Sequence, residues 1–577
     1  MTLFNHFETE IQQIFENLAV ANHWTEGLNL ARVTVELPRD EAHGDLATNA
    51  AMVMAGQVKM KPRDLADLLA DQLRQLDKVE QVDIAGPGFI NITLTDGCWG
   101  AEIGSILEAG ADYGRSDLGG GAPVNVEFVS ANPTGPLHAA HARGAIFGDV
   151  LAHLLRFTGY DVTREYYIND AGAQVDVLGR SAFLRYREAL GEEIGEIPAG
   201  LYPGAYLKEV GEALKQAHGS SLLEMEEAGR HELIRNFAID AMMASVKADL
   251  AELGVDMDIY SSERAFVESG RVQSAMDRLS ADGLVYTGIP EAPKGAKDND
   301  WEPREQLLFK SSDYGDDVDR ALQKSDGSWT YFASDVAYHM DKLDRTKGQL
   351  IDVWGADHGG YVKRMSAAIE AMSGQKNQLD VKLCQLVSLL DNGKPVKMSK
   401  RAGTFVTLSD VMAAVGADVM RFIMLTRRSD QPLEFDYAKV TEKSRDNPVF
   451  YVQYGHARAC SVLRQPEAAG LNLDRADADR HLTAPAELRL IKQLCSWPKA
   501  LSAAALAHEP HRIAFYLMDL AADFHALWNA GRDDPALKFI QAEDGDITTA
   551  RLRLVKATAQ VLKSGLGLMS ITAYEEM

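Results

Sequence analysis

Apolar residues in the first 116 positions recur with helical spacing in some segments and form short runs in others. The helical spacing predicts three helices, over residues 3–20, about 46–56 and about 61–76. Two short apolar runs, separated by Gly86-Pro-Gly88, predict strands over residues 81–84 and 89–94. A Gly-rich linker follows at residues 116–121. We therefore predict a small α/β domain over residues 1–116.

Strand-like runs alternate with helical segments between residues 117 and 437. The predicted strands cover residues 124–129, 161–168, 350–354 and 381–387. Such alternation is typical of a doubly wound parallel sheet, a Rossmann-like architecture that binds nucleotides at the carboxyl ends of its strands. The chain from about 180 to 320 is helical and polar, which indicates a solvated insertion.

The strand patterns stop near residue 438, and helical periods continue to residue 577. We therefore predict an all-α bundle over residues 438–577. A chain of 577 residues exceeds what one hydrophobic core usually serves, so three domains are reasonable. The predicted fold class is α/β: a doubly wound catalytic sheet between a small α/β domain and a helical bundle.

The composition indicates the cellular compartment of the protein and the state of its cysteines. No apolar run reaches the roughly 18 residues of a membrane helix, and the first predicted helix carries Glu8, Glu10 and Glu16, which a secretory signal would exclude. We therefore expect a cytoplasmic protein without a membrane partner. The four cysteines lie far apart with no CxxC pair, which indicates reduced thiols and no zinc site.

The net charge of −25 argues against indiscriminate binding of nucleic acid, because Lys and Arg contacts to phosphates supply most of that affinity. It does not exclude a local basic track on an acidic body. We expect no DNA partner, and we expect a monomer.

The pair His138 and His141 is set in a context that favours chemistry. A β-rich run precedes it, a Pro/Gly loop at residues 132–136 follows that run, and a helix begins at the histidines. The N-terminus of a helix attracts phosphate, and imidazoles add donors, so we expect nucleotide phosphate here. A second HxxH pair, His508 and His511, lies in an alanine-rich helix without such a setting and serves as a control.

A basic segment, KPVKMSKRAGT over residues 394–404, follows the turn signal Asp391-Asn-Gly393. It could be an ordinary solvated hairpin. It could also close Lys397 and Lys400 over a triphosphate and neutralise the charge that develops as pyrophosphate leaves.

Together, the HxxH helix and the KMSK segment resemble the class I aminoacyl-tRNA synthetases, and neighbouring residues resemble the arginyl-tRNA synthetase family. The matching segments are EFVSANPTGPLHAAH (127–141), YYINDAG (166–172), WGADHGGY (354–361), NPVFYVQYGHAR (447–458) and HGD (43–45). Ala140 departs from the family pattern, in which glycine is common at this position.

The resemblance implies an arginine–tRNA ligase that forms arginyl-adenylate from arginine and ATP and transfers arginine to the 3′-terminal adenosine of tRNA(Arg). Mg²⁺ would be carried with ATP, with no dedicated protein site. His138, His141, Lys397 and Lys400 would be catalytic. The implied ATP-binding residues are Pro133, Thr134, Gly135, His138, His141, Met398, Ser399 and Lys400.

The resemblance also implies two further groups of binding residues. Arginine would be held by Glu127, Ser130, Asn132, Tyr331, Asp335, Asp357 and His358. The C-terminal bundle would bind the anticodon, and the implied tRNA-binding residues are Tyr451, Tyr454, Arg458, Trp528 and Met577. The N-terminal domain would contact the tRNA elbow.

The chemistry of arginine gives the acidic candidates a separate rationale. A guanidinium has five donors in a rigid plane, so its pocket needs carboxylates. Glu127 lies in an apolar strand, where an unpaired carboxylate is costly, and a cationic ligand would supply a partner. Asp335 follows Tyr331 by one helical turn.

Three alternatives remain at this point. A small-molecule adenylyltransferase would share the HxxH helix, but a helical domain of over 130 residues disfavours it. A catalytically silent RNA-binding relative would be expected to lose Lys400 or the histidines, which are present. The third is another class I specificity. A cysteine enzyme would need zinc ligands, which this chain lacks, and a glutamate enzyme would need an arginine in place of Glu127.

Overall fold

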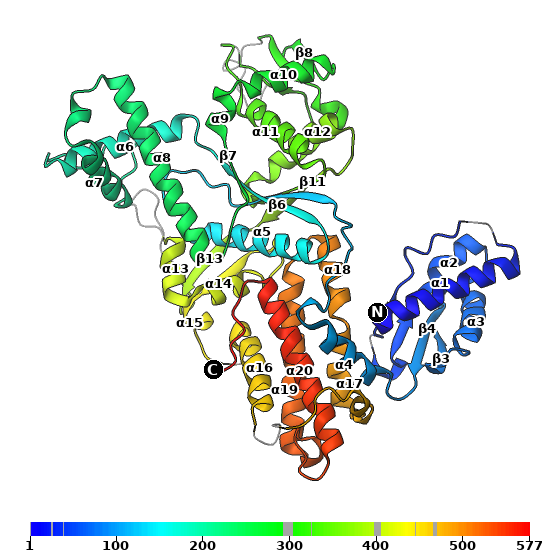
Figure 1. Ribbon diagram of the computed structural model, residues 1–577. Coiled ribbons are helices and arrows are strands. Elements are labelled where there is room, and N and C mark those ends of the chain that lie inside the picture. The colour runs from blue at the N-terminus through cyan, green and yellow to red at the C-terminus, as the bar shows by residue number, and fades with distance from the viewer. Residues whose placement is uncertain are drawn as a thin grey trace.

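The computed structural model describes residues 2–24, 27–38, 40–291, 304–324, 326–396, 406–444, 446–465 and 470–577. In Figure 1 the N-terminal lobe lies to one side of a larger body, whose upper part holds a sheet and whose lower part is a helical bundle. No described helix is both long and apolar enough to span a bilayer.

The N-terminal lobe is a four-stranded antiparallel sheet in the order β1-β2-β4-β3, covered by helices. Its elements are α1 (Leu3–Asn22), β1 (Val35–Glu36), η1 (Glu41–His43), β2 (Leu46–Thr48), α2 (Ala50–Val58), α3 (Pro62–Leu73), β3 (Val79–Ala85) and β4 (Phe89–Leu94). The helix predicted over residues 46–56 is wrong in its first part. Leu46 and Thr48 are buried on alternate positions and pair with β4, so this segment is a strand before α2 begins.

A connecting segment leaves the lobe through α4 (Cys98–Ala109) and η2 (Gly110–Asp112). Helix α4 packs against α17 (Pro485–Cys495) and α20 (Gly545–Leu568) of the C-terminal bundle. Asp45 of the lobe accepts from Trp99 Nε1 at 2.9 Å and forms an ion pair with Lys492 of α17 at 2.8 Å. The N-terminal lobe is thereby tied directly to the bundle.

The central sheet has five parallel strands in the order β12-β11-β5-β6-β7. They are β5 (Pro123–Glu127), β6 (Asp161–Ile168), β7 (Ile259–Ser262), β11 (Gln349–Gly355) and β12 (Leu379–Cys384). The chain passes outward from β5 to β6 and β7, then returns to β11 on the other side of β5. This reversal places a topological switch point between β5 and β11, where doubly wound sheets bind ligands.

Helices flank this sheet and link its strands. They are α5 (Ala139–Phe157), α11 (Tyr331–Thr346), η5 (Ala356–Tyr361) and α12 (Val362–Ser373). Val126 and most residues of α5 are fully buried, so the core of this domain lies between α5 and the sheet. The predicted doubly wound fold class is confirmed.

The region predicted as an insertion also supplies β7, the fifth strand of the central sheet. Its remaining described elements are α6 (Ala173–Ala189), α7 (Tyr206–His218), η3 (Ser221–Leu223), α8 (Glu227–Glu252), α9 (Glu263–Glu268), α10 (Arg271–Ala281), β8 (Val285–Gly288), β9 (Gln306–Phe309), η4 (Ser311–Tyr314) and β10 (Arg320–Ala321). Strand β7 was missed because its four residues are only partly buried and show no apolar run.

The strand predicted over 381–387 is divided between two sheets. β12 ends at Cys384, whereas β13 belongs to a separate sheet with β14 and β15. This part of the chain contains β13 (Val387–Asp391), β14 (Lys394–Pro395), α13 (Leu408–Val415), α14 (Ala417–Met424), β15 (Leu433–Asp436) and α15 (Tyr437–Val440). The predicted tight turn is present, since Asn392 and Gly393 both have positive φ between β13 and β14.

The C-terminal part is helical throughout its described residues. Besides α17 and α20 it contains α16 (Pro448–Leu463), η7 (Ala476–His481), α18 (Trp497–Ala507), α19 (His511–Asp533) and η8 (Pro535–Leu537). The prediction that the control histidines share one helix is wrong. His508 ends α18 in the left-handed conformation, and His511 begins α19.

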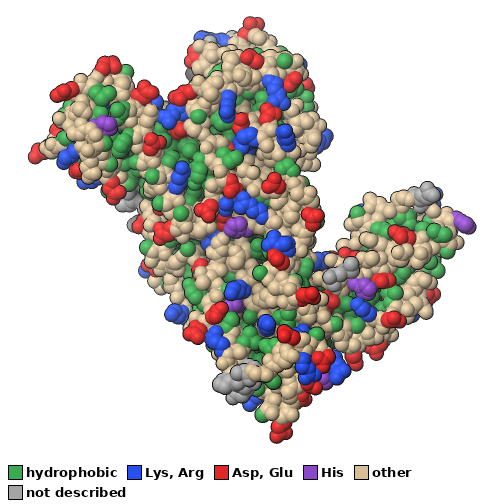
Figure 2. Space-filling model, viewed as in Figure 1, with side chains coloured by type: hydrophobic (Ala, Val, Ile, Leu, Met, Phe, Trp, Pro, Cys, Tyr) green, Lys and Arg blue, Asp and Glu red, His purple; other side chains and the backbone are tan. Residues whose placement is uncertain are grey.

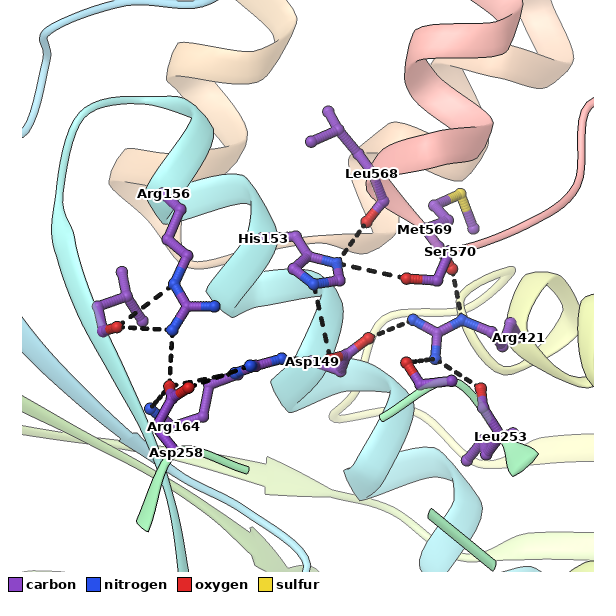
Figure 3. Close-up of polar contacts among 12 residues, drawn as sticks. Asp149, His153, Arg156, Arg164, Leu253, Asp258, Arg421, Leu568, Met569 and Ser570 are labelled. Carbon is purple, nitrogen blue, oxygen red and sulfur yellow. Dashed lines mark hydrogen bonds and ion pairs between the residues drawn. The ribbon is translucent and has the colours of Figure 1, made fainter. Parts of the chain in front are cut away.

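A buried guanidinium joins the sheet domain to the bundle (Figure 3). Arg421 of α14 donates to the Asp149 carboxylate of α5, to the Leu253 carbonyl that ends α8, and to the Met569 carbonyl that ends α20. His153 of α5 lies 3.3 Å from the Leu568 carbonyl. The helix that begins at the HxxH pair is therefore anchored to the bundle from below.

Candidate active site

The turn after β5 has an unusual backbone. Val129 and Ser130 both have positive φ, at 70° and 41°, and this conformation is costly for a β-branched residue such as valine. The turn directs Ser130 Oγ to donate to Glu127 Oε1 at 2.9 Å and to accept the Tyr167 amide at 3.1 Å. The end of β5 is thereby attached to β6 at the switch point of the sheet.

His138 and His141 are placed by the first turn of α5. His138 is the N-cap residue, its backbone N–H donates to His141 Nδ1 at 3.0 Å, and the two ring centroids are 5.0 Å apart. Because Nδ1 of His141 accepts a hydrogen bond, its neutral imidazole carries the proton on Nε2. His141 can therefore present an N–H donor away from the helix backbone.

The loop before α5 and the first helices of the insertion enclose a cavity of about 420 Å³. Thr134, Gly135, His138 and His141 line it, as their predicted contact with nucleotide requires. Tyr206 of α7 closes one side and donates its hydroxyl to the Thr134 carbonyl at 2.7 Å. Pro133 is buried and is not among the lining residues.

The predicted loop residues Lys397, Met398, Ser399 and Lys400 lie outside the described residues. Where the described chain resumes, the Val406 carbonyl accepts the Ala139 amide at 3.2 Å, and the Leu408 amide donates to the Leu137 carbonyl at 2.8 Å. The segment after the loop therefore adjoins the HxxH turn. One of the first amides of α5 is already bonded there, so it is not open to a ligand as the sequence reasoning assumed.

Glu127 has an internal cationic partner, which corrects the argument that it needs a ligand to balance its charge. Lys342 of α11, fully buried, donates to Glu127 Oε2 at 2.7 Å and to Asp352 Oδ1 at 2.6 Å. Burial disfavours the ammonium, but Asp352 and Glu127 outweigh it and raise the pKa of Lys342. Burial also opposes the charge on Asp352, yet Lys342 and His339 lower the pKa of Asp352 to about 2.

Glu127, His339 and Asp352 have a spacing that could hold a metal ion. The Lys342 ammonium already bonds two of these three, and His339 Nε2 lies 2.9 Å from Asp352. The residues therefore form a complete ion-pair network, and their arrangement gives no support for a resident metal.

A second acidic group lies next to this network. Asp335 accepts the Tyr361 hydroxyl at 2.5 Å, and its burial, together with Glu127, raises its pKa. Glu263 at the start of α9 is 6% exposed, and burial with the charges of Asp335 and Asp170 raises the pKa of Glu263 to about 7. Asp335 and Glu263 thus repel each other in a buried setting, and among the described residues no ammonium or guanidinium pairs with either of them.

The remaining predicted arginine contacts differ in position. Tyr331 is 69% exposed at the start of α11, and Asn132 donates to Gln174 at 2.9 Å. His358 lies near enough to Asp335 to lower the pKa of that carboxyl, after larger effects of burial and Tyr361. Asp357 is exposed, and its ion-pair partner is His358 at 3.7 Å.

Three family models match the chain. "Arginyl tRNA synthetase N terminal domain" covers residues 5–94, "tRNA synthetases class I (R), catalytic domain" residues 102–431, and "DALR anticodon binding domain" residues 452–577. An arginine–tRNA ligase of Rhodopseudomonas palustris is 58% identical over 96% of this chain and 94% of its own length. One of Parvibaculum lavamentivorans is 55% identical over the whole of both chains.

The chain belongs to the arginyl-tRNA synthetase family. An arginyl-tRNA synthetase from Thermus thermophilus shares its fold, with a TM-score of 0.75 at 21% identity over both complete chains. The predicted family and arginine–tRNA ligase activity are confirmed. The alternatives of an adenylyltransferase without RNA, a silent relative and another amino-acid specificity are therefore set aside.

In this synthetase four of the five residues predicted to bind tRNA, all but Met577, form one cluster on α16 and α19. The Arg458 guanidinium lies 4.5 Å from the Tyr454 ring centroid and 4.6 Å from that of Trp528. Tyr451 packs beside His525, whose Nδ1 lies 2.9 Å from Arg458 Nη1. Trp528 also lines a cavity of about 430 Å³. Met577 is apart from this group. It is exposed at the end of the tail that comes after α20 and is hydrogen-bonded to α16 and to Arg464, which directly follows that helix.

The sequence reasoning missed most of the buried network of this synthetase. Tyr338 donates to Glu127 and to Glu165, both at 3.0 Å, and Arg345 donates to Glu165 at 2.9 Å. A signal was available, because Asp335, Tyr338, Lys342 and Arg345 recur at spacings of three and four along α11. Glu263 carried no such signal, since only the fold brings α9 to the end of β6.

Proposed function

We propose that arginine is bound with its guanidinium between Asp335 and Glu263 and that Glu127 supports this site from below. The supporting observation is that Asp335 and Glu263 lie close enough to interact, and that Asp335 also interacts with Glu127 at the end of β5. Burial, and after it the neighbouring carboxylates, raises the pKa of Asp335 and Glu263, and a guanidinium would pair with both of them. Ser130 holds Glu127, and Tyr331, Asn132 and His358 lie at the rim.

We further propose that ATP lies in the cavity at the start of α5. His138 and His141 would donate to its phosphates, Thr134, Gly135 and Pro133 would shape the turn around it, and Met398 and Ser399 would close over it. Lys397 and Lys400 would stabilise the negative charge of the departing pyrophosphate. The described residues that line the cavity include no carboxylate, so Mg²⁺ would arrive with ATP, and it would supply charge neutralisation at the phosphates.

Two steps then follow. An oxygen of the arginine carboxylate attacks the α-phosphorus of ATP, the bond to the bridging oxygen breaks, and pyrophosphate leaves from arginyl-adenylate. The 2′-hydroxyl of the terminal adenosine of tRNA next attacks the acyl carbon and releases AMP. No side chain of the chain needs to form a covalent bond.

The domain roles are also proposals. The lobe that ends at β4 would contact the tRNA elbow, the sheet domain would catalyse, and the bundle would bind the anticodon through Tyr451, Tyr454, Arg458 and Trp528, with Met577 beside it. The chain would act as a monomer. Helix α4 lies with the bundle, so we place the first boundary before Cys98, earlier than the linker suggested.

One experiment tests the activity and its specificity together. ATP–pyrophosphate exchange is measured with each of the twenty amino acids, with and without total tRNA. Arginine alone should support exchange, because its guanidinium pairs with the carboxylates of the site. Any other side chain would leave these buried carboxylates unpaired. Exchange driven equally by another amino acid would contradict the proposal.

The arginine site has a more direct test. Asp335→Ala should raise the KM for arginine about 100-fold or more, the cost of removing one charged partner, and should change the KM for ATP little. Initial rates of exchange at varied arginine and varied ATP separate the two. Equal rises in both would show that Asp335 supports the whole site and does not select arginine.

A further inference from the structure

A basic groove lies apart from the catalytic cavity, where α5, α16 and α20 meet the segment after α4. It encloses about 920 Å³. Its polar rim includes Arg115, Arg156, Lys556 and Lys563, with the histidines His153 and His456. Glu575 is the one carboxylate among its described lining residues, and two further acids, Asp112 and Asp258, pair with the arginines from outside the lining. On the face shown in Figure 2, Lys, Arg and His side chains are visible where α5 passes over α20.

Two lysines of α20 are exposed charges that line this basic groove. Lys556, Gln560, Lys563 and Gly567 recur at spacings of four, three and four, so they share one face of the helix. Both lysines are exposed, and neither has an ion-pair partner within 4 Å among the described residues. Arg551 and Arg553 of the same helix are instead buried in ion pairs with Glu487 and Asp479.

The two arginines of the groove are held in place by their own contacts. The Arg115 guanidinium lies 4.5 Å from the Phe157 ring centroid and bonds Asp112 at 2.7 Å. Arg156 donates to the Val162 carbonyl at 2.8 Å and to Asp258, as Figure 3 shows. Such fixed guanidinium groups lose little freedom when they meet a phosphate.

Among the described residues that line the groove, no exposed aromatic ring offers a surface on which a base could stack. Phe157 is 8% exposed and covered by Arg115, and the remaining floor is aliphatic, with Ala559 and Leu568. Lys556 and Lys563 are separated by seven residues, or about 10 Å along the helix, so they can meet different phosphates of one strand. These features suit a phosphate backbone and not the reading of bases.

We propose that this basic groove binds the sugar–phosphate backbone of a tRNA stem, without selecting its sequence. The proposal rests on the tRNA substrate of the proposed function and adds a contact outside the aromatic cluster of α16 and α19. Because Arg115 and Arg156 are paired with Asp112 and Asp258, the free positive charge of the groove on this chain of net charge −25 comes from Lys556 and Lys563. The groove borders the connecting segment, the HxxH helix and the bundle, so a bound stem would span all three.

The test compares two charge-matched double variants of the full chain. Lys556→Gln/Lys563→Gln removes the two free charges of the groove. Lys347→Gln/Lys376→Gln removes two exposed lysines from the turns before β11 and β12, neither of which lines the groove. Equilibrium binding of tRNA(Arg) is measured between 50 and 300 mM salt, conditions in which each lost phosphate contact reduces the slope of log Kd against log salt by roughly 0.7 to 0.9.

The groove variant should lose about 1.5 from that slope and bind tRNA(Arg) about tenfold or more weakly at low salt. The control variant should keep the wild-type slope, and Lys556→Arg/Lys563→Arg should restore it. The KM for tRNA should rise while kcat at saturating tRNA stays unchanged, because the lysines lie outside the catalytic cavity.

Two outcomes would overturn the proposal. An unchanged slope in the groove variant would show that tRNA does not use the groove. Equal losses in both double variants would show a general effect of charge. Arginine-dependent exchange by the wild-type chain is measured first, so a failure of the proposed function is recognised separately.

Discussion

At the residue scale, Lys342 sets the electrostatics beneath the arginine site. Its ammonium is fully buried and bonded to Glu127 and Asp352, with Glu165 close enough to raise its pKa further. One of its two direct partners, Glu127, therefore has a cation beside it in the core and is not an unpaired buried carboxylate. The buried lysine thus balances the carboxylates beneath the proposed arginine site.

Replacement of this lysine should be costly. Lys342→Met leaves two buried carboxylates without their cation, so we expect a loss of about 3–5 kcal/mol in the free energy of unfolding. Urea unfolding measures it, with the exposed Lys376→Met as control. The loss should shrink as pH falls, because the orphaned carboxylates have raised pKa values in the folded variant and become neutral. A deficit that is independent of pH would contradict the ion-pair explanation.

Glu263 should give arginine binding a pH dependence. Its pKa of about 7 means that the free site holds a neutral carboxyl at pH 6 and a carboxylate at pH 8. A guanidinium stays charged throughout and prefers the carboxylate, so the KM for arginine should fall as pH rises through 7. Glu263→Gln should flatten this profile and raise the KM most at pH 8, which exchange assays at varied pH would record. A variant that keeps the wild-type profile would remove Glu263 from the site.

At the element scale, α5 positions the HxxH pair by lying unusually close to the sheet. Gly148 permits this, because a Cβ at that position would lie 2.2 Å from Cγ of Phe128. Gly144 in the same helix has open space, with its nearest neighbour at 4.0 Å. The two glycines therefore form a matched pair within one helix.

Gly148→Ala should push α5 away from the sheet. We expect a loss of about 1–3 kcal/mol, as for other overpacked cores, and a raised KM for ATP because the histidines move with the helix. Gly144→Ala should leave the KM for ATP unchanged and should keep the stability or raise it by up to about 1 kcal/mol, because alanine is favoured over glycine inside a helix. Thermal unfolding and exchange kinetics measure the two effects, and equal behaviour of both variants would exclude the close approach as their cause.

At the scale of the whole molecule, the Arg421 contacts unite three regions that are distant in the chain. Asp149 belongs to the HxxH helix, Leu253 ends the insertion helix α8, and Met569 follows the last helix of the bundle. A single guanidinium thereby satisfies two helix-end carbonyls and one buried carboxylate. The bundle and the catalytic sheet are held in one orientation by this contact.

Arg421→Leu should therefore weaken the contact between the catalytic sheet domain and the C-terminal bundle and lower the free energy of unfolding. Asp149 would keep only the more distant Arg164, at 3.7 Å, and His153, at 3.8 Å, so we expect a loss of about 3–5 kcal/mol. Arg428→Leu, which breaks an exposed ion pair with Asp430, should cost less than about 1 kcal/mol. Urea unfolding compares the two, and similar midpoints would contradict the role of Arg421.

Much of the fold follows from local patterns that the sequence displays directly. The helix from Leu3 was predictable because one helical period of apolar residues controls it, and strands β4 and β6 were predictable because β-branched and aromatic residues concentrate in them. Strand β2 and strand β7 were not, because each is short and is defined by its partner strand. The HxxH turn was also predictable, since the strand, loop and helix that build it are contiguous.

What the sequence determined by itself is the family, the kinds of chemistry present and the elements that carry them, because motifs and periods are local properties of a chain. Tertiary structure alone decided which charges meet. It paired Glu127 with Lys342, brought Glu263 to Asp335, and set Lys556 and Lys563 beside Arg115 and Arg156. Electrostatic interactions depend on distance and burial, and residues far apart in the chain acquire both only when the chain folds.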